Sequence, residues 1–86
     1  MTTLTFQELK TLWTHCGLGK LPPDTQFITW LAMHQWETVK YGIAKAAAKN
    51  VSLNGEMSLD YKVRFASKVM RTRTTQGQMR TTGGLI

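Results

Sequence analysis

The sequence predicts an all-α domain, a small compact four-helix domain with a flexible basic C-terminal tail. Three observations support this prediction. Apolar residues recur at helical spacing in each long segment, only two prolines occur in 86 residues, and the alternation typical of strands is brief. The hydrophobic fraction of 42% is that of a globular chain rather than a disordered one. We therefore expect a single helical domain over residues 1–71 and a tail over residues 72–86.

The first helix is expected over residues 6–16. Thr5 and Glu8 have the spacing of a capping box, in which each side chain satisfies a free backbone amide of the first turn. Apolar residues then follow along one face: Phe6, Leu9, Leu12, Trp13 and Cys16. Gly17 stands where a left-handed residue commonly ends a helix. This segment therefore has both a start and a stop signal.

Residues 17–23 form a connection, since they contain both prolines and two glycines. Asp24 follows directly and is suited to cap the next helix, because a carboxylate also interacts favourably with the positive end of the helix dipole.

Residues 25–49 contain no proline and one glycine, so one long helix is an open alternative. The apolar residues change direction on the helical wheel partway along the segment, near Gln35. We therefore favour two helices, over residues 25–34 and 37–49, with Asn50 as the stop signal. Such a pair resembles a helix-turn-helix only loosely, because the turn has no glycine.

Residues 50–57 are expected to form a loop around the turn dipeptide Asn54-Gly55, and a short hairpin is the less favoured alternative. The last helix should start at Ser58, a good N-cap, and end near Arg71. Its apolar face consists of residues at helical spacing: Leu59, Val63, Ala66 and Met70.

The net charge of +6 is concentrated at the C-terminal end. Residues 1–60 carry equal numbers of basic and acidic side chains, whereas residues 61–86 contain no acid. The basic residues there are the predicted binding residues for nucleic acid or an acidic partner: Lys62, Arg64, Lys68, Arg71, Arg73 and Arg80. Arginine offers a fork of donors suited to phosphate and carboxylate. Arg64, Lys68 and Arg71 share one stripe of the last helix, opposite its apolar face.

Aromatic side chains provide a second set of candidates. Three tryptophans are many for so small a domain, so an exposed ring would be a binding anchor. The candidate protein contacts are Trp30, Trp36 and Tyr41. Cys16 is expected in the core and His34 is expected to be partly buried and hydrogen-bonded. Two histidines, one cysteine and five scattered acids make neither a metal set nor a catalytic one, so we expect no enzyme, metal or cofactor.

These observations favour a small non-enzymatic accessory or regulatory protein whose last helix and tail bind nucleic acid, DNA or RNA, or a nucleoprotein complex. The alternative is an inhibitor or adaptor that binds a larger host protein, one of a nucleic-acid-processing or defence complex. In its overall style the chain resembles small accessory proteins of phages and plasmids. With no long apolar run, no secretory signal and one cysteine, we expect a cytoplasmic protein that does not bind a membrane.

Overall fold

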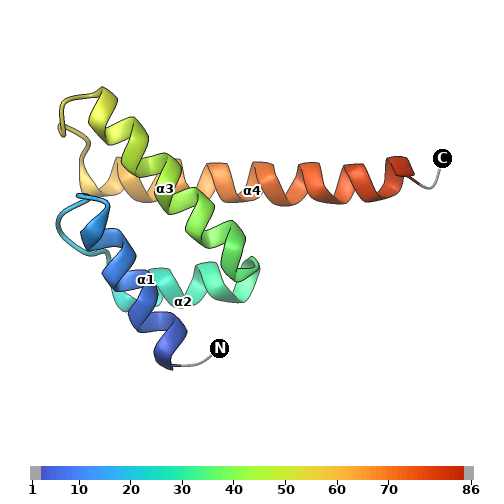
Figure 1. The fold of residues 1–86 in the computed structure, drawn as a ribbon, viewed down its shortest axis with the longest axis horizontal. Helices are drawn as coiled ribbons and strands as arrows, with labels where there is room; N and C mark the ends of the chain where they lie inside the picture. Colours follow the sequence, from blue (N-terminus) through green and yellow to red (C-terminus); the bar gives the residue numbers. More distant parts are fainter. Residues whose placement is uncertain (1–2, 85–86) are drawn as a thin grey trace.

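A computed structural model describes the backbone of residues 3–84 and the side chains of residues 5–74. Four helices follow one another: α1 (Thr3–His15), α2 (Asp24–Met33), α3 (Trp36–Ser52) and α4 (Leu59–Gly84) (Figure 1). The described residues contain no strand, which confirms the all-α prediction. Of these described helices, none combines the length and apolar character that crossing a bilayer requires.

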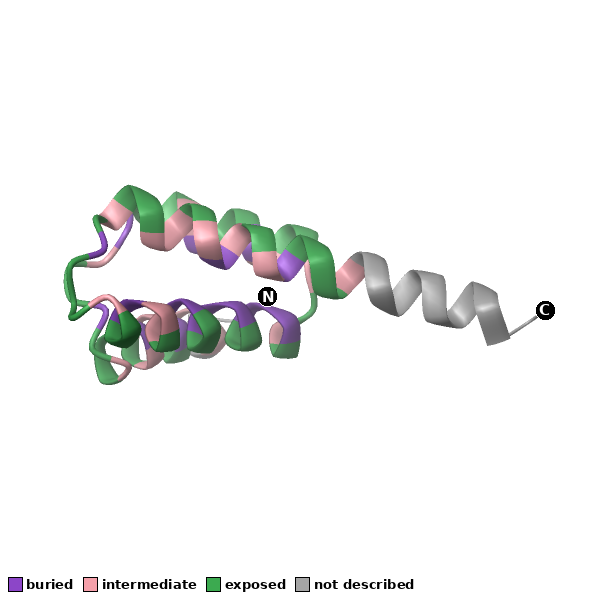
Figure 2. Ribbon diagram, turned by 90° about the horizontal axis from the view of Figure 1, so that it is seen from above, coloured by how far each residue is buried: buried purple, intermediate pink, exposed green. Residues whose placement is uncertain are grey.

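The helices pack in two crossed layers. In Figure 1, α1 and α3 run diagonally and nearly side by side, whereas α2 and α4 lie along the horizontal. Seen from above in Figure 2, the buried residues lie on the sides of the helices that face the other layer. The first half of α4 packs on the domain, and the backbone of its second half extends past the other three helices.

The α1–α2 connection begins with a complete C-terminal cap. The N–H of Gly17 donates to the carbonyl of Thr14 (3.0 Å), and that of Leu18 donates to Trp13 (3.3 Å). Gly17 has φ +76°, the left-handed conformation that this cap requires. The predicted stop is therefore confirmed. The predicted start at residue 6 is three residues late: α1 begins at Thr3, and Thr5 lies inside it.

Asp24 does not cap α2, contrary to the prediction. Pro23 occupies the N-cap position, no side chain caps the helix, and Asp24 is its first residue. The carboxylate instead lies 3.6 Å from the Lys10 ammonium of α1. Asp24 therefore stays in the first turn, where its charge suits the helix dipole, and links α2 to α1.

The break between α2 and α3 lies where the apolar pattern predicted it. His34 and Gln35 are both extended, with φ/ψ of −137°/158° and −69°/155°. The N–H of His34 donates to Trp30 (2.9 Å) and closes α2. Phe27 and Trp30 of α2 and Val39 and Ile43 of α3 are all buried in the same core, although on one continuous helix these two pairs would point in different directions.

Asn50 does not stop α3, which continues to Ser52. Its buried side chain instead accepts the N–H of Met57 (3.3 Å), and its carbonyl accepts that of Gly55 (2.8 Å). Asn54 and Gly55 both have positive φ, so the turn forms as predicted, but no hairpin forms around it. Asn50 thus organises the loop from inside the preceding helix.

α4 starts as predicted, because the Ser58 hydroxyl accepts the N–H of Tyr61 (3.1 Å). The prediction that it ends near Arg71 is wrong: it continues to Gly84. No proline follows Pro23 in the chain, and a single interior glycine such as Gly77 costs only about 1 kcal/mol. The flexibility of residues 72–86 stays a prediction, since the side chains beyond Thr74 lie outside the described residues.

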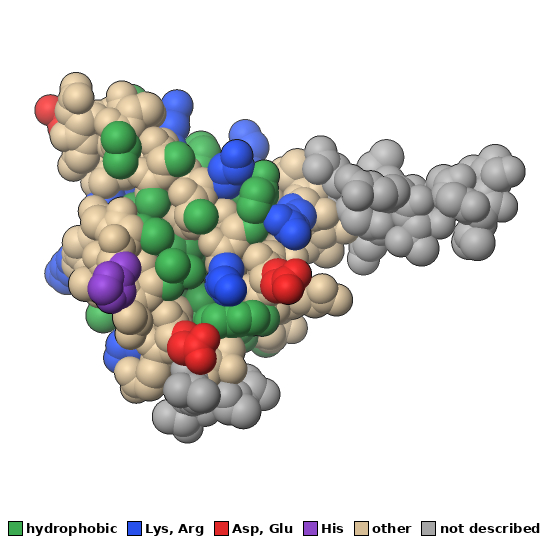
Figure 3. All heavy atoms as spheres, in the orientation of Figure 1, with side chains coloured by type: hydrophobic (Ala, Val, Ile, Leu, Met, Phe, Trp, Pro, Cys, Tyr) green, Lys and Arg blue, Asp and Glu red, His purple; other side chains and the backbone are tan. Residues whose placement is uncertain are grey.

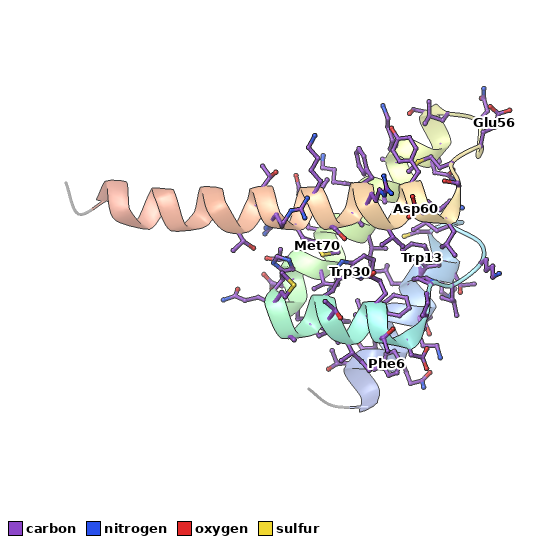
Figure 4. The ribbon with its side chains drawn as sticks, turned by 180° about the vertical axis from the view of Figure 1, so that it is seen from behind. Phe6, Trp13, Trp30, Glu56, Asp60 and Met70 are labelled. Atoms are coloured by element: carbon purple, nitrogen blue, oxygen red, sulfur yellow. The ribbon has the colours of Figure 1, made fainter. Side chains whose placement is uncertain are left out.

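Aromatic rings fill the core between the layers. Trp13, Phe27 and Trp30 are buried, with ring centroids 5.8–6.3 Å apart. Both indole N–H groups are satisfied: that of Trp13 by the Lys20 carbonyl (3.0 Å) and that of Trp30 by the Ser67 hydroxyl (2.9 Å). Figure 4 shows Trp13 and Trp30 pointing into the space between the helices. The second bond ties α2 to α4.

α3 and α4 approach closely at Gly42. A Cβ atom there would lie 2.6 Å from Met70 Cγ and 2.9 Å from the Ala66 carbonyl oxygen, closer than real Cβ atoms come. Gly42, Ala66 and Met70 are all buried. A glycine is therefore needed at position 42. It allows α3 and α4 to approach closely at their crossing point.

Candidate functional site

A groove lies between α3 and α4, and its walls are basic and aromatic. Five cationic side chains line it: Lys45, Lys49, Arg64, Lys68 and Arg73. Three aromatic rings lie among them: Tyr41, Tyr61 and Phe65. Asp60 is the one acid among the lining residues. In the space-filling view, Lys and Arg side chains gather where α3 and α4 diverge (Figure 3).

The α3 wall is a single helical stripe. Tyr41, Lys45 and Lys49 follow one another at four-residue intervals, so they lie on the same side of the helix. The Lys45 ammonium lies 5.4 Å from the centre of the Tyr41 ring, within the range of a cation–π interaction. Ile43 and Ala46, between them in sequence, are buried in the core. Because Ile43 and Ala46 face the core, the stripe of Tyr41, Lys45 and Lys49 lies on another side of α3, the side that lines the groove.

The α4 wall pairs a cationic stripe with an aromatic one. Arg64 and Lys68 are exposed and one turn apart. At 100° per residue, Tyr61 and Phe65 lie between that cationic stripe and the buried face of α4. Their ring centroids are 6.4 Å apart with an interplanar angle of 47°. The aromatic rings therefore lie inside the groove, with cations on its outer edge.

One contact joins the two walls. The Arg73 guanidinium of α4 lies over the Tyr41 ring of α3, 4.5 Å from the ring centre. Arginine binds well in this position because its planar group is weakly hydrated and stacks on aromatic faces. Tyr41 is thus covered by cations from both helices and holds Arg73 and Lys45 at the groove.

The groove has little internal charge compensation. The Asp60 carboxylate, in the first turn of α4 (Figure 4), lies 3.0 Å from the Arg64 Nε, and both side chains are largely exposed. Such an exposed ion pair is worth about 0.2–1 kcal/mol. Five cations around one carboxylate leave an excess of positive charge, which a bound anion would neutralise.

The basic residues predicted to bind a partner do not all lie in the groove. Arg64, Lys68 and Arg73 line the groove. The Lys62 ammonium instead donates to the carbonyl of Leu18 (2.6 Å), so it holds the α1–α2 connection. Arg71 is exposed but does not line the groove, although it shares a sequence stripe with Arg64 and Lys68. Arg80 lies outside the described side chains.

Sequence reasoning missed Lys45 and Lys49, which belong to the part of the chain with no net charge. The fold brings them opposite the cations of α4, while the acids that balance them in the count, such as Glu8, Asp24 and Glu37, do not line the groove. The four-residue spacing from Tyr41 indicates that the three residues share one side of a helix, but it does not indicate that this side faces α4.

The three aromatic candidates have three different environments. Trp30 is in the core, only 2% exposed, so its ring offers no surface to a partner in this fold. Trp36 is half-buried, with the Lys40 ammonium 5.3 Å from its ring centre. Tyr41 is 37% exposed and lines the groove. Of the three, only Tyr41 lies beside the groove cations.

His34 is partly buried and hydrogen-bonded, as predicted. Its Nδ1 lies 3.0 Å from the Thr74 hydroxyl of α4. Burial lowers the pKa of His34, and the nearby positive charge of Arg71 lowers it further. Cys16 is half-buried against the core. Within the part of the chain that the structure describes, no three His, Cys, Asp or Glu side chains come together as a potential metal site.

No protein-family model matches the chain, and no curated protein or solved structure is similar to it. The function of the groove must therefore follow from the chemistry of its own side chains. Those side chains are hydrogen-bond donors with positive charge and rings with exposed faces, and both are groups that nucleic acids engage.

Proposed function

We propose that this protein is a non-enzymatic accessory protein that binds nucleic acid in the groove between α3 and α4. The observation that carries the proposal is the composition of the groove, with five cations, three aromatic rings and one carboxylate. Phosphate backbones supply the anionic charge that this groove lacks, and bases supply flat faces for its rings.

The arrangement suits a polyanion better than a single small anion. Lys45 and Lys49 on one wall, and Arg64 and Lys68 on the other, are each one helical turn apart. Residues at this spacing have Cβ atoms about 5–6 Å apart. Each wall thus presents a row of positive charges, which suits the row of negative charges along a chain of phosphates. Because the contacts are to phosphates, we expect binding that depends on salt and not on sequence.

The test is a fluorescence anisotropy titration of the full chain with unrelated DNA and RNA oligonucleotides, at about 50 and 200 mM salt. We expect binding that weakens steeply with salt. Arg64→Ala with Lys68→Ala should weaken it for all sequences and reduce the salt slope by about 0.7 per lost contact on a single strand. Binding that is absent at low salt would contradict the proposal.

An acidic protein surface is the second candidate, and one observation favours it. Arg64 already binds a carboxylate, that of Asp60, at 3.0 Å. Tyrosine and arginine are also enriched among the residues that dominate protein interfaces. In this case the protein would be an adaptor or inhibitor of a larger complex. The same titration separates the two candidate functions. A nucleic-acid-binding protein should bind the oligonucleotides at low salt, whereas a protein specific for an acidic protein surface should not.

A further inference from the structure

The groove carries exposed aromatic surface that phosphate binding alone does not use. Tyr61 is 44% exposed and lies beside Phe65, which is half-buried. Resting on the proposed function, we infer that the groove takes single-stranded nucleic acid, with a base stacked on Tyr61 while the cations hold the flanking phosphates.

Tyr61 is better placed for stacking than the other groove tyrosine. The Tyr41 ring is already covered by Arg73, at 4.5 Å, with Lys45 at 5.4 Å. The nearest ring to Tyr61 that the structure shows is Phe65, tilted by 47° at 6.4 Å, so the two rings are not stacked face to face. Tyr61 thus keeps exposed ring surface beside Phe65.

The order of side chains across α4 matches a single strand. Arg64 and Lys68 form the outer edge, Tyr61 and Phe65 follow, and Lys45 and Lys49 stand opposite on α3. A single strand can turn its bases toward the rings and its phosphates toward either row of cations. A duplex keeps its bases stacked inside and presents mainly phosphates, so it would use the cations but not Tyr61.

The charge of the groove and its rings together also explain why sequence preference should be weak. Every base has a flat face that stacks on an aromatic ring, and stacking of this kind tolerates any base. Among the side chains that the structure describes, the uncharged polar groups of the groove are the hydroxyls of Ser58, Thr72 and the two tyrosines. No asparagine or glutamine is among them, so base edges have few uncharged hydrogen-bond partners there.

The test compares a single-stranded oligothymidylate with a duplex of equal length, about 12 nucleotides, at low salt. We expect Tyr61→Ala to weaken single-strand binding about fivefold or more and to leave duplex binding unchanged. Tyr61→Phe keeps the ring face and should bind the single strand like the original protein. Circular dichroism of both variants checks that the helices are retained, as expected for an exposed position.

Each outcome has a distinct meaning. If Tyr61→Ala binds the single strand as tightly as the original protein, the inference is wrong, whereas binding through the cations still stands. If the duplex binds as tightly as the single strand in the original protein, the inference is also wrong. If neither probe binds, the proposed function itself fails. Tighter binding of polyglutamate than of either oligonucleotide would overturn both in favour of an acidic protein partner.

Discussion

The aromatic residues of this protein form two clusters with opposite surroundings. Trp13, Phe27 and Trp30 meet edge to face or tilted in the core, and the indole N–H groups of the two tryptophans donate to neighbouring oxygens. Tyr41 and Tyr61 instead lie exposed in a groove lined by lysine and arginine. The first cluster stabilises the fold by excluding water, whereas the rings of the second remain partly exposed to solvent. Aromatic content alone therefore does not distinguish the two clusters; burial and the charges beside the rings do.

The largest effect on stability is expected from the removal of a core ring. Trp30→Ala should lower the free energy of unfolding by about 3–5 kcal/mol, because it leaves a cavity and removes the bond to Ser67. Urea denaturation followed by circular dichroism measures the loss. Tyr61→Ala, the control from the other cluster, should cost less than about 1 kcal/mol. Equal losses would show that the clusters do not differ in role.

Two lysines of the same helix sharpen the contrast further. Lys62→Met removes the charged donor of a part-buried hydrogen bond to the Leu18 carbonyl and should cost about 1.5–3 kcal/mol of stability. Lys68→Met removes the same charge from the groove and should leave stability within about 0.5 kcal/mol. Nucleic-acid affinity should fall more for Lys68→Met. The reverse order, measured by anisotropy and denaturation together, would place the site elsewhere on α4.

The crossing of α3 and α4 links stability to the groove. Gly42→Ala should destabilise the protein by about 1–3 kcal/mol, because the new methyl group meets Met70 Cγ and the backbone of Ala66. By separating the helices it should also weaken nucleic-acid binding. Ala44→Leu is the control: it adds more volume at an exposed position of the same helix and should have little effect on either. A more stable Gly42→Ala variant would contradict this packing.

The smallest expected effect is the pH dependence from His34. Its pKa is lowered in the folded protein, so the unfolded chain binds the proton more readily. Stability should therefore be complete above the ordinary histidine pKa of about 6.5 and decrease as the pH falls below it. His34→Gln should flatten this dependence in denaturation curves between neutral and acidic pH. His15→Gln, which leaves the His34 contacts in place, should not, and an unchanged slope in His34→Gln would exclude the effect.

Local signals predicted most of the fold. Gly17, Ser58 and the change of apolar direction near Gln35 each act within a few residues, so spacing alone identified them. Asp24 was misassigned because its partner, Lys10, is in another helix. The end of α4 was misplaced because residues after Arg71 lack an apolar face but also lack a proline.

The groove was only half predictable, for a different reason. Counting charge along the chain revealed Arg64, Lys68 and Arg73. It could not reveal Lys45 and Lys49, because their place opposite α4 depends on the long-range packing of Gly42 against Met70. The net charge of a segment does not show which side chains are neighbours. The charge of a groove depends on which cations the fold brings together and on which acids lie elsewhere.

The most direct test of the groove compares two double variants that each lose two positive charges. Lys45→Ala with Lys49→Ala removes the α3 wall, and Lys40→Ala with Arg71→Ala removes two exposed cations outside the groove. Both proteins are titrated with the same single-stranded oligonucleotide at low salt. We expect the first variant to lose markedly more affinity than the second, with a lower salt slope. Equal losses in the two variants would show that net charge, and not the groove, binds the nucleic acid.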